Sequence, residues 1–356
     1  MRKLASMVLA AALMLPLSAC GVGAGSGTQS DPGASQNIQG GETMEEHYIF
    51  DLSETVTRTP VTYPNRYGIE LSADLYLPQD LDEAQSYPAL VIGPPYGGVK
   101  EQGPGVWADQ LAQRGFVVLA FDPSFNGESG GEPRHVSSPD IFTEDFSAGV
   151  DYLGSLDYVD RDRIGAIGIC GSGGFALSAA QVDTRIRAVA TASLVDISGN
   201  YTGLSPEDRA ALLERLSQQR WTDFANGQPE YIPSYPEEPT QEIPQGLDPM
   251  SAEFYSFYAT SRGFHPRARA NFTTTSEAAF ANYSLLGHLD TIAPRPVLML
   301  AGENAMTRGL SELVFDQLGE NKELVVVEGA NHVDLYDDVT KIPFDRIEAF
   351  FKEALQ

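Results

Sequence analysis

The chain has 356 residues, of which 42% are hydrophobic and 20% charged, and 49 acidic against 23 basic residues give a formal net charge of −26. A chain of this size buries roughly 75% of the surface that it exposes when unfolded, which excludes a disulfide-stapled mini-protein and a disordered chain. So acidic a surface repels phosphate, and nucleic-acid binding is therefore disfavoured.

The N-terminal 44 residues are typical of an export signal followed by a tether. Arg2 and Lys3 precede an apolar run at 4–17, which is too short to span a membrane and has the layout of a secretory signal peptide. The run ends Leu17-Ser18-Ala19-Cys20, which resembles the lipobox of bacterial lipoproteins. The resemblance implies that residues 1–19 are removed and that Cys20 carries lipid. An ordinary signal peptide with an incidental cysteine is the alternative.

This interpretation sets the expected location of the protein. Residues 20–44 are rich in Gly and Ser, as a flexible tether is. We expect an exported chain that is lipid-anchored through Cys20 to the outside of the cytoplasmic membrane or to the outer membrane. No other stretch of about 18 apolar residues is present. The oligomeric state is not indicated.

From residue 45 to 356 the pattern predicts one α/β domain. An antiparallel pair is expected at 47–63 and 69–77, and buried strands at 89–92, 116–121, 163–169, 187–195, 296–301 and 323–328. Helices are expected near 105–114, 139–156, 173–181, 309–318 and 342–355. Repeated strand–helix units with nearly continuous apolar strands predict a mostly parallel twisted sheet with helices on both faces.

Residues 200–290 interrupt this alternation and are too long for a structureless loop. An insertion after the carboxyl end of a strand lies where ligands bind in such sheets. We therefore expect a cap over an active site. A surface insertion that serves stability alone is the alternative.

A strand, a sharp Gly-rich turn and a helix follow one another over residues 163–174, with the sequence RIGAIGICGSGG. This segment resembles the G-x-S-x-G nucleophile elbow of the α/β-hydrolase superfamily, in which small neighbours are required two residues on either side of the nucleophile. Counting from the strand places Cys170 at the nucleophile position, between Gly168 and Ser172. The rival frame makes Ser172 the nucleophile, between Cys170 and Gly174. The strand register favours Cys170.

A cysteine in that place is similar to the dienelactone-hydrolase-like branch of the superfamily. The segments GVKEQ at 98–102, GESGGEPR at 127–134 and TEDFSA at 143–148 extend the resemblance, which also includes polyketide-transferase-like proteins and covers about 45–355. The resemblance implies an α/β-hydrolase fold and an enzyme that acts on a small-molecule ester, lactone or thioester.

The same turn also fits a dinucleotide-binding fingerprint. Residues 171–176 read G-x-G-x-x-A, and Asp196 follows twenty residues later, where it would hold a ribose. That fingerprint normally opens a domain, whereas about four predicted strands precede it here. It also leaves the C-terminal histidine motif unexplained.

Among the five histidines, His332 follows the end of the last buried strand. The α/β-hydrolases carry their general base on that loop, so the resemblance assigns this role to His332, against a purely structural histidine. The oxyanion donors are expected to be the N–H of Gly171 and an N–H in the loop after residue 92, from Tyr96 or Gly97, because the prolines there cannot donate.

The acid that would orient the histidine has no candidate at the position usual for the resembled family. The usual position, three residues after Gly302, is Ala305, which carries no carboxyl group. Asp196 is slightly favoured over Glu303, and a solvated carboxylate is the alternative for each. A Cys–His pair needs less help, because imidazolium holds a nearby thiolate.

These observations predict an enzyme with a Cys170 thiolate nucleophile, or a Ser172 nucleophile in the rival frame. The acyl-enzyme would be cleared by water, or by an amine or alcohol acceptor in an acyltransferase. A non-catalytic ligand-binding lipoprotein on the same fold is the alternative. No metal-ligand spacing and no P-loop occurs, so no cofactor and no metal is implied. The cap residues Arg262, His265, Arg267 and Arg269 are expected to pair with nearby acids rather than to receive a substrate carboxylate.

Overall fold

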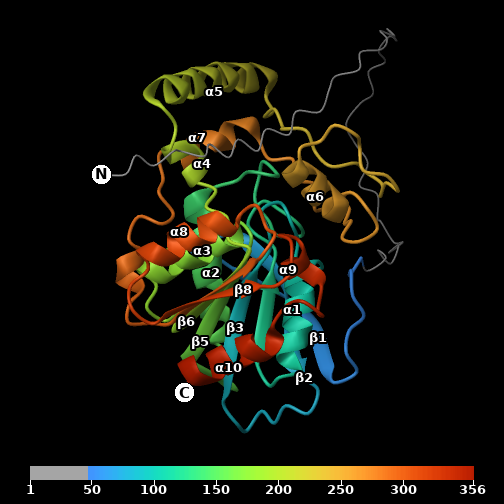
Figure 1. Cartoon of the computed structure of the whole chain (residues 1–356), viewed down its shortest axis with the longest axis vertical. Coiled ribbons are helices and arrows are strands. Elements are labelled where there is room, and N and C mark those ends of the chain that lie inside the picture. Colours follow the sequence, from blue (N-terminus) through green and yellow to red (C-terminus); the bar gives the residue numbers. More distant parts are fainter. Residues whose placement is uncertain (1–46) are drawn as a thin grey trace, which may run out of the picture.

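The computed structural model describes residues 47–356, and the predicted signal peptide, Cys20 and nearly all of the tether lie outside them. One eight-stranded sheet with the order β1-β2-β4-β3-β5-β6-β7-β8 organises this part of the chain (Figure 1). The strands are β1 (Val56–Pro64), β2 (Glu70–Pro78), β3 (Tyr87–Gly93), β4 (Val117–Phe121), β5 (Val159–Ile169), β6 (Ala188–Ala192), β7 (Val297–Gly302) and β8 (Lys322–Val327).

All strand pairs from β4 to β8 are parallel, whereas β1 pairs with β2, and β2 with β4, in the antiparallel sense. Helices cover both faces, as the long apolar strands require. One face carries α1 (Gly103–Ala112) and α10 (Phe344–Ala354), which contact each other, and the other carries α2 (Pro139–Leu153) and α3 (Ser172–Val182). The predicted α/β-hydrolase architecture is confirmed.

The expected elements all occur, with shifted ends. The first strand begins at Val56 rather than near residue 47, because a turn in which Val56 N–H donates to Ser53 O precedes it. The strand expected at 187–195 ends at Ala192, where Ser193 takes a φ of 50° that breaks the extended backbone. The helix expected to reach residue 156 ends at Leu153, before Gly154.

Residues between β6 and β7 form a layer of short helices, here called the inserted segment (199–292). Its helices are α4 (Gly199–Thr202), α5 (Pro206–Asn226), α6 (Pro249–Tyr258), α7 (Glu277–Phe280) and the 3₁₀ turns η1 (Thr274–Ser276) and η2 (Leu289–Ile292). In Figure 1 the helices α4 to α7 lie beyond one end of the sheet, with α5 outermost. Across residues 47–356, no helix is both long and apolar enough to cross a membrane.

The remaining helices follow the last strands and link the sheet to the loops beyond it. They are α8 (Arg308–Gln317), which contacts β7 and β8, and the single turn α9 (Asp334–Asp337), which contacts α1. Trp107 of α1 is fully buried, and its indole N–H donates to Leu335 O at 3.1 Å. The turn α9 is thereby fixed against the core, and α9 carries part of the site described next.

Candidate active site

Cys170 lies at the turn between β5 and α3, with a φ of 55°. A non-glycine residue in this left-handed region costs of order 1–3 kcal/mol, and such strain is held only where the surroundings determine it. Here the Cys170 N–H donates to Ala192 O at 2.8 Å, and Cys170 O accepts from Gly173 N–H at 2.9 Å and from Val195 N–H at 3.0 Å. Three backbone bonds therefore fix the turn and direct the side chain out of the sheet.

The neighbours of Cys170 are small because there is no space for larger ones. A Cβ on Gly168 would lie 2.1 Å from Ser172 O, and a Cβ on Gly171 would lie 2.7 Å from the Cβ of Tyr96. Glycine is thus required on one side of the turn by α3 and on the other by the loop after β3. This is the steric requirement of a nucleophile elbow.

The sulfur of Cys170 lies among hydrogen-bond donors. The backbone N–H groups of Gly171 and Tyr96, and the hydroxyl of Tyr336, all hydrogen-bond to it. The two N–H groups are the expected oxyanion donors, and the structure brings them to one atom. The third candidate, Gly97, lies against the inserted segment, since a Cβ on it would be 2.7 Å from Ala270 Cβ.

Burial nevertheless raises the pKa of the Cys170 thiol, while the bonds from Tyr336, Gly171 and Tyr96 lower it in part. The net direction is upward, so the resting sulfur is a neutral thiol at neutral pH. Because Cys170 directly precedes Gly171, the N-cap of α3, the N-terminal end of this helix favours negative charge on the sulfur.

His332 follows β8 on the expected loop, and it is buried between two hydroxyl groups. Its Nδ1 is 2.6 Å from Thr307 Oγ1, and its Nε2 is 2.9 Å from the Tyr336 hydroxyl. The Tyr336 oxygen therefore lies between the imidazole and the sulfur of Cys170 and bonds to both. Burial lowers the pKa of His332 to about 3, so the imidazole is neutral at physiological pH.

The position of this histidine is fixed from the sheet and from the inserted segment. Ser193 Oγ donates to His332 O at 2.7 Å, which ties the loop to the end of β6. On the other side, Glu253 of α6 accepts from Val333 N–H at 2.9 Å, and the Phe254 ring meets the imidazole edge-on with centroids 5.1 Å apart. The inserted segment thus contributes directly to the position of His332.

Neither carboxylate expected to orient His332 does so. Asp196 accepts from Ser198 Oγ at 2.6 Å, and Glu303 accepts from Gly329 N–H at 3.0 Å. Among residues 47–356, the hydrogen-bond partners of the ring nitrogens are Thr307 and Tyr336. The expectation of a carboxylate partner is therefore wrong. The buried hydroxyl of Thr307, five residues after Gly302, bonds to Nδ1 of His332 where a carboxylate was expected.

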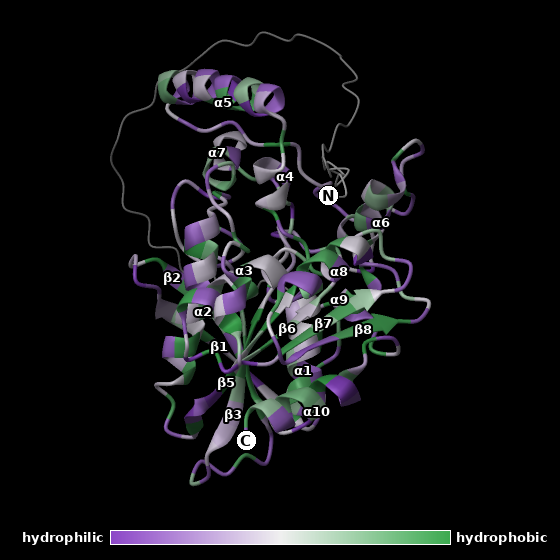
Figure 2. Cartoon of the chain, turned by 60° about the vertical axis from the view of Figure 1, so that its left-hand side comes forward, coloured by the Kyte–Doolittle hydropathy of each residue, from purple (hydrophilic) through white to green (hydrophobic). Residues whose placement is uncertain are grey.

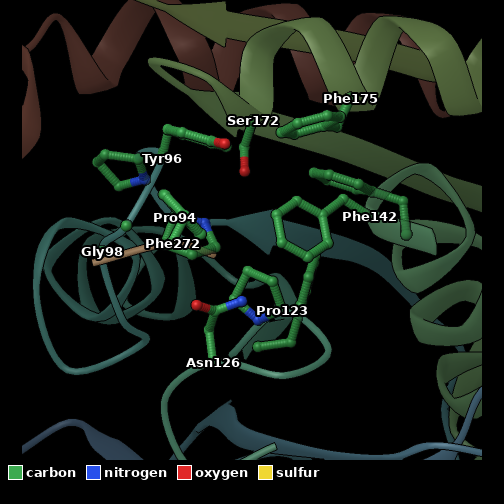
Figure 3. Close-up of a pocket in the computed structure, with 13 residues that line it drawn as sticks. Pro94, Tyr96, Gly98, Pro123, Asn126, Phe142, Ser172, Phe175 and Phe272 are labelled. Carbon is green, nitrogen blue, oxygen red and sulfur yellow. The ribbon is translucent and has the colours of Figure 1, made fainter. Parts of the chain in front are cut away.

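Ser172 is buried at the start of α3 and lines a separate small cavity of about 10 Å³. Figure 3 shows its hydroxyl in that cavity, which it shares with aromatic rings and prolines such as Phe142, Phe175, Pro94 and Pro123. A volume of this size holds at most about one water molecule and no substrate. Cys170, by contrast, lines a cavity of about 410 Å³.

The large cavity is enclosed mostly by apolar and aromatic side chains of the inserted segment and of the loops after β3 and β6. Its charged members come from the outer helices: Asp208 and Arg215 of α5 and Glu277 of α7. Arg215 pairs with Glu277. Members with apolar or aromatic side chains include Tyr96, Val195, Ile197, Tyr201, Ile232, Tyr235, Phe254, Tyr258 and Phe272.

One carboxylate cluster has the spacing of a metal site, but a lysine already occupies it. Glu101, Asp122 and Glu128 place oxygens within 4.8 Å of one another. Lys100 Nζ lies among them, at 2.6 Å from Glu101, 3.4 Å from Asp122 and 2.7 Å from Glu128. The ammonium supplies the positive charge that these acids require, since an unpaired buried charge is strongly destabilising.

The basic residues of the inserted segment form ion pairs, as expected. Arg267 pairs with Glu101 at 2.6 Å, and Arg269 with Glu237 at 3.1 Å. Arg262 pairs with Asp334 at 3.1 Å and with Asp337 at 2.7 Å, both in α9. His265 Nε2 lies 3.8 Å from Glu101. These contacts join the inserted segment to the core near the elbow and to the helix that carries Tyr336.

The fingerprint reading of the same turn finds no support in these contacts. The N–H of Gly171 is directed at the Cys170 sulfur, and Asp196 is held by Ser198.

Two residues of the site were missed by the sequence analysis. Tyr336, in the single turn α9, lies four residues after His332 on the loop before it, and this spacing was a usable signal. Thr307 gave no such signal, because a hydroxyl partner for the imidazole is not part of the pattern that the resemblance implied.

Comparison with known proteins finds a family model and relatives that match most of the chain. The family model of the X-Pro dipeptidyl-peptidases (S15 family) matches residues 67–330. The uncharacterized protein PA2218 of Pseudomonas aeruginosa is 46% identical over 98% of this chain and 94% of its own length. The crystal structure of PA2218 matches 90% of this chain and 100% of its own chain, with a TM-score of 0.83.

Two further relatives are similar over most of the domain. The uncharacterized protein YcjY of Escherichia coli is 36% identical over 83% of this chain and 97% of its own length. The polyketide transferase grgF of a Penicillium species is 27% identical over 82% of this chain and 95% of its own length. The crystal structure of GrgF, at 24% identity and a TM-score of 0.69, covers 84% of this chain and 99% of its own and shares the fold.

The titration of the Cys170 thiol tests this description of the site. Because the raised pKa keeps the resting sulfur neutral, we expect alkylation of Cys170 by iodoacetamide to be slow at pH 7. It should rise by about tenfold per pH unit toward pH 9, with no plateau below pH 7. The measurement is the rate of labelling of the Cys170 peptide against pH. A plateau near pH 6 would indicate a resting thiolate–imidazolium pair and contradict this description.

The Tyr336→Phe variant completes that experiment. Loss of the hydroxyl removes a hydrogen bond to the thiolate, worth about 1.5–3 kcal/mol for a charged acceptor, and alkylation at pH 8 should slow by roughly tenfold or more. Tyr258→Phe is the matched control, because its hydroxyl bonds to that of Tyr336, so its effect should be smaller.

Proposed function

The chain belongs to the X-Pro dipeptidyl-peptidase (S15) family, within the α/β-hydrolases, and we propose that it cleaves or transfers the acyl group of an uncharged small-molecule ester, lactone or thioester through a Cys170 acyl-enzyme. The observation that carries the proposal is the position of the Cys170 sulfur. It opens onto the 410 Å³ cavity and receives hydrogen bonds from two backbone N–H groups. Oriented N–H groups of this kind stabilise an oxyanion that forms beside a nucleophile.

Acylation begins with the proton of the thiol. The thiol proton passes to the Tyr336 oxygen while the Tyr336 proton passes to His332 Nε2, as the sulfur attacks the carbonyl carbon. The C=O electron pair moves to oxygen, where the N–H groups of Gly171 and Tyr96 bind it. Because both the resting thiol and the resting imidazole are neutral, proton transfer accompanies attack instead of preceding it.

Collapse of the tetrahedral intermediate completes acylation, and deacylation follows. The C–S bond remains, the bond to the leaving group breaks, and the proton held at Nε2 passes to the leaving group through Tyr336. Water, or the hydroxyl or amine of an acceptor, then attacks the thioester carbon while His332 takes its proton along the same path. The C–S bond breaks, the acyl product leaves, and the proton returns from Nε2 through Tyr336 to the sulfur. Thr307 accepts the Nδ1–H of the imidazole and so keeps Nε2 as the basic nitrogen.

The cavity supports an uncharged acyl group of modest size. Its volume lies within the range of small-molecule sites, and aromatic rings such as Tyr235, Phe254 and Phe272 line it. We propose that the inserted segment is the cap of this site, because it supplies most of these rings. The family name raises the alternative of an Xaa-Pro peptide substrate, whose N-terminal ammonium would face Asp208 and Glu277.

A non-catalytic ligand-binding protein is the second candidate. The neutral hydroxyl of Thr307 in place of an acid favours it, since imidazolium then gains no charged partner. The same cavity would hold the ligand, and Cys170 would be a buried thiol.

Turnover of model substrates separates these functions. We expect hydrolysis of p-nitrophenyl acetate and butyrate, a loss of at least about 100-fold in Cys170→Ala, and a change below about threefold in Ser172→Ala. The absence of turnover with any activated ester would favour the binding protein. Turnover of Gly-Pro-p-nitroanilide in preference to the esters would favour the peptidase, and full activity in Cys170→Ala would remove the proposed nucleophile.

We also propose export of the chain and lipid anchoring at Cys20, on the strength of the lipobox-like sequence Leu17-Ser18-Ala19-Cys20. Mass spectrometry of the mature N-terminal peptide should find a diacylglyceryl group on Cys20, and Cys20→Ala should release the chain from the membrane fraction. Cys170→Ala is the matched cysteine control and should remain in that fraction. An unmodified Cys20 in the exported chain would contradict this proposal.

A further inference from the structure

The outermost helix, α5, exposes an apolar stripe on the face that points away from the cavity. Trp221 is 72% exposed and Phe224 is 86% exposed, and Leu213, about two turns before Trp221 on the same helix, is 37% exposed. At about 100° per residue, these three positions fall within an arc of about 80° on the helix. Figure 2 shows α5 at the far end of the inserted segment, separated from the sheet by the other helices. Exposure of two large aromatic side chains on one helical face marks an interaction surface.

The opposite face of α5 belongs to the active site. Asp208, Leu212 and Arg215 line the cavity that reaches Cys170, and Leu216 is buried. The helix contacts α7 and η1 through that side. A partner or surface that docks on the outer stripe therefore lies one helix diameter, about 10–12 Å, from the cavity.

We propose that the stripe Leu213–Trp221–Phe224 docks α5 onto the surface of the membrane to which the chain is anchored, which places the cavity of the enzyme at the lipid–water interface. Tryptophan and phenylalanine are the side chains typical of the apolar face of such interfacial helices. This inference rests on the proposed anchor at Cys20 and extends the proposed function. It does not depend on the chemistry at Cys170.

The chain between the anchor and the fold is long enough for this contact. The 26 residues between Cys20 and His47 span at most about 90 Å when extended. The chain then enters the described structure beside the inserted segment, because the rings of His47 and His265 are 5.7 Å apart. The described chain thus begins beside His265, in the same inserted segment that carries α5.

Charge decides which lipid surface fits. A net charge of −26 opposes adsorption to strongly anionic lipid, so the contact is apolar and suited to zwitterionic headgroups. A cavity lined by aromatic rings takes apolar substrates, and such compounds concentrate in membranes. The orientation therefore gives the cavity access to substrate held at the membrane surface.

Tryptophan fluorescence of the lipid-anchored full chain on vesicles is a direct test. The chain has two tryptophans, and Trp107 is fully buried, so a lipid quencher acts on Trp221. In phosphatidylcholine vesicles brominated near the top of the acyl chains, we expect roughly twofold quenching of the Trp221 emission relative to unbrominated vesicles. Trp221→Phe should abolish this quenching, which assigns the signal.

Substitutions on the stripe distinguish docking from other occupants. The double variant Leu213→Ser, Phe224→Ser should reduce the quenching by at least about threefold, whereas Val182→Ser, which changes another exposed apolar side chain at the end of α3, should leave it unchanged. Equal Trp221 emission in brominated and unbrominated vesicles would overturn the proposal. A dimer in detergent that Phe224→Ser dissociates would instead assign the stripe to a second copy of the chain.

The outcomes of this test and of the proposed function are separable. Hydrolysis of a soluble p-nitrophenyl ester in detergent should be the same in Leu213→Ser, Phe224→Ser as in the native chain, because these side chains are outside the cavity. Quenching without turnover would leave the membrane contact in place and remove the enzymatic proposal. Turnover without quenching would leave the enzymatic proposal in place and remove the membrane contact.

Discussion

The backbone of Cys170 in the left-handed region is the constraint on which the site depends. A chain that continued as extended strand would bury the sulfur between the helices that cover the sheet, whereas a φ of 55° turns it toward the loops beyond the strand ends. The turn is held by hydrogen bonds to β6 and to the loop after it, and by glycines that no side chain can replace without collision. Strain of this kind, kept by surrounding structure, is characteristic of functional turns.

Around that sulfur the protein uses hydroxyl groups where a charged partner was expected. Tyr336 joins Cys170 to His332, and the Thr307 hydroxyl is hydrogen-bonded to the other ring nitrogen of the imidazole. Such a chain keeps every member neutral at rest, which suits a buried site in which an isolated charge is costly. In the proposed reaction, charge develops only when the carbonyl oxygen of a substrate reaches the N–H groups of Gly171 and Tyr96.

The extent to which the sequence predicted this structure differs between fold and site. The apolar runs of β3, β5 and β7 predicted buried parallel strands, because burial on both faces removes the alternation of polar residues. The elbow at Cys170 and the loop of His332 were found by their order along the chain. The ends of strands were less predictable, since β6 stops at the local backbone geometry of Ser193.

The hydrogen-bond partners of the His332 imidazole could not be predicted from the number of residues that separate them from a strand end. Asp196 and Glu303 each lie at the end of a parallel strand, as an acid should, but local bonds from Ser198 and Gly329 hold them. Whether a carboxylate reaches a histidine depends on side-chain directions set by loops and not on sequence spacing. The exposed stripe of α5 could not be predicted from the sequence either. Helical periodicity gives apolar residues on two faces of this helix, and only the packing in the structure shows which face is covered.

The most direct test of the central claim is the mass of the enzyme during turnover. Brief reaction with an activated ester, acid quenching and intact-mass measurement should show one added acyl group, mapped by peptide analysis to Cys170. The adduct should persist in Ser172→Ala and be absent in Cys170→Ala. An adduct mapped to Ser172, or steady ester turnover with no acyl group on Cys170 at any time point, would contradict the account.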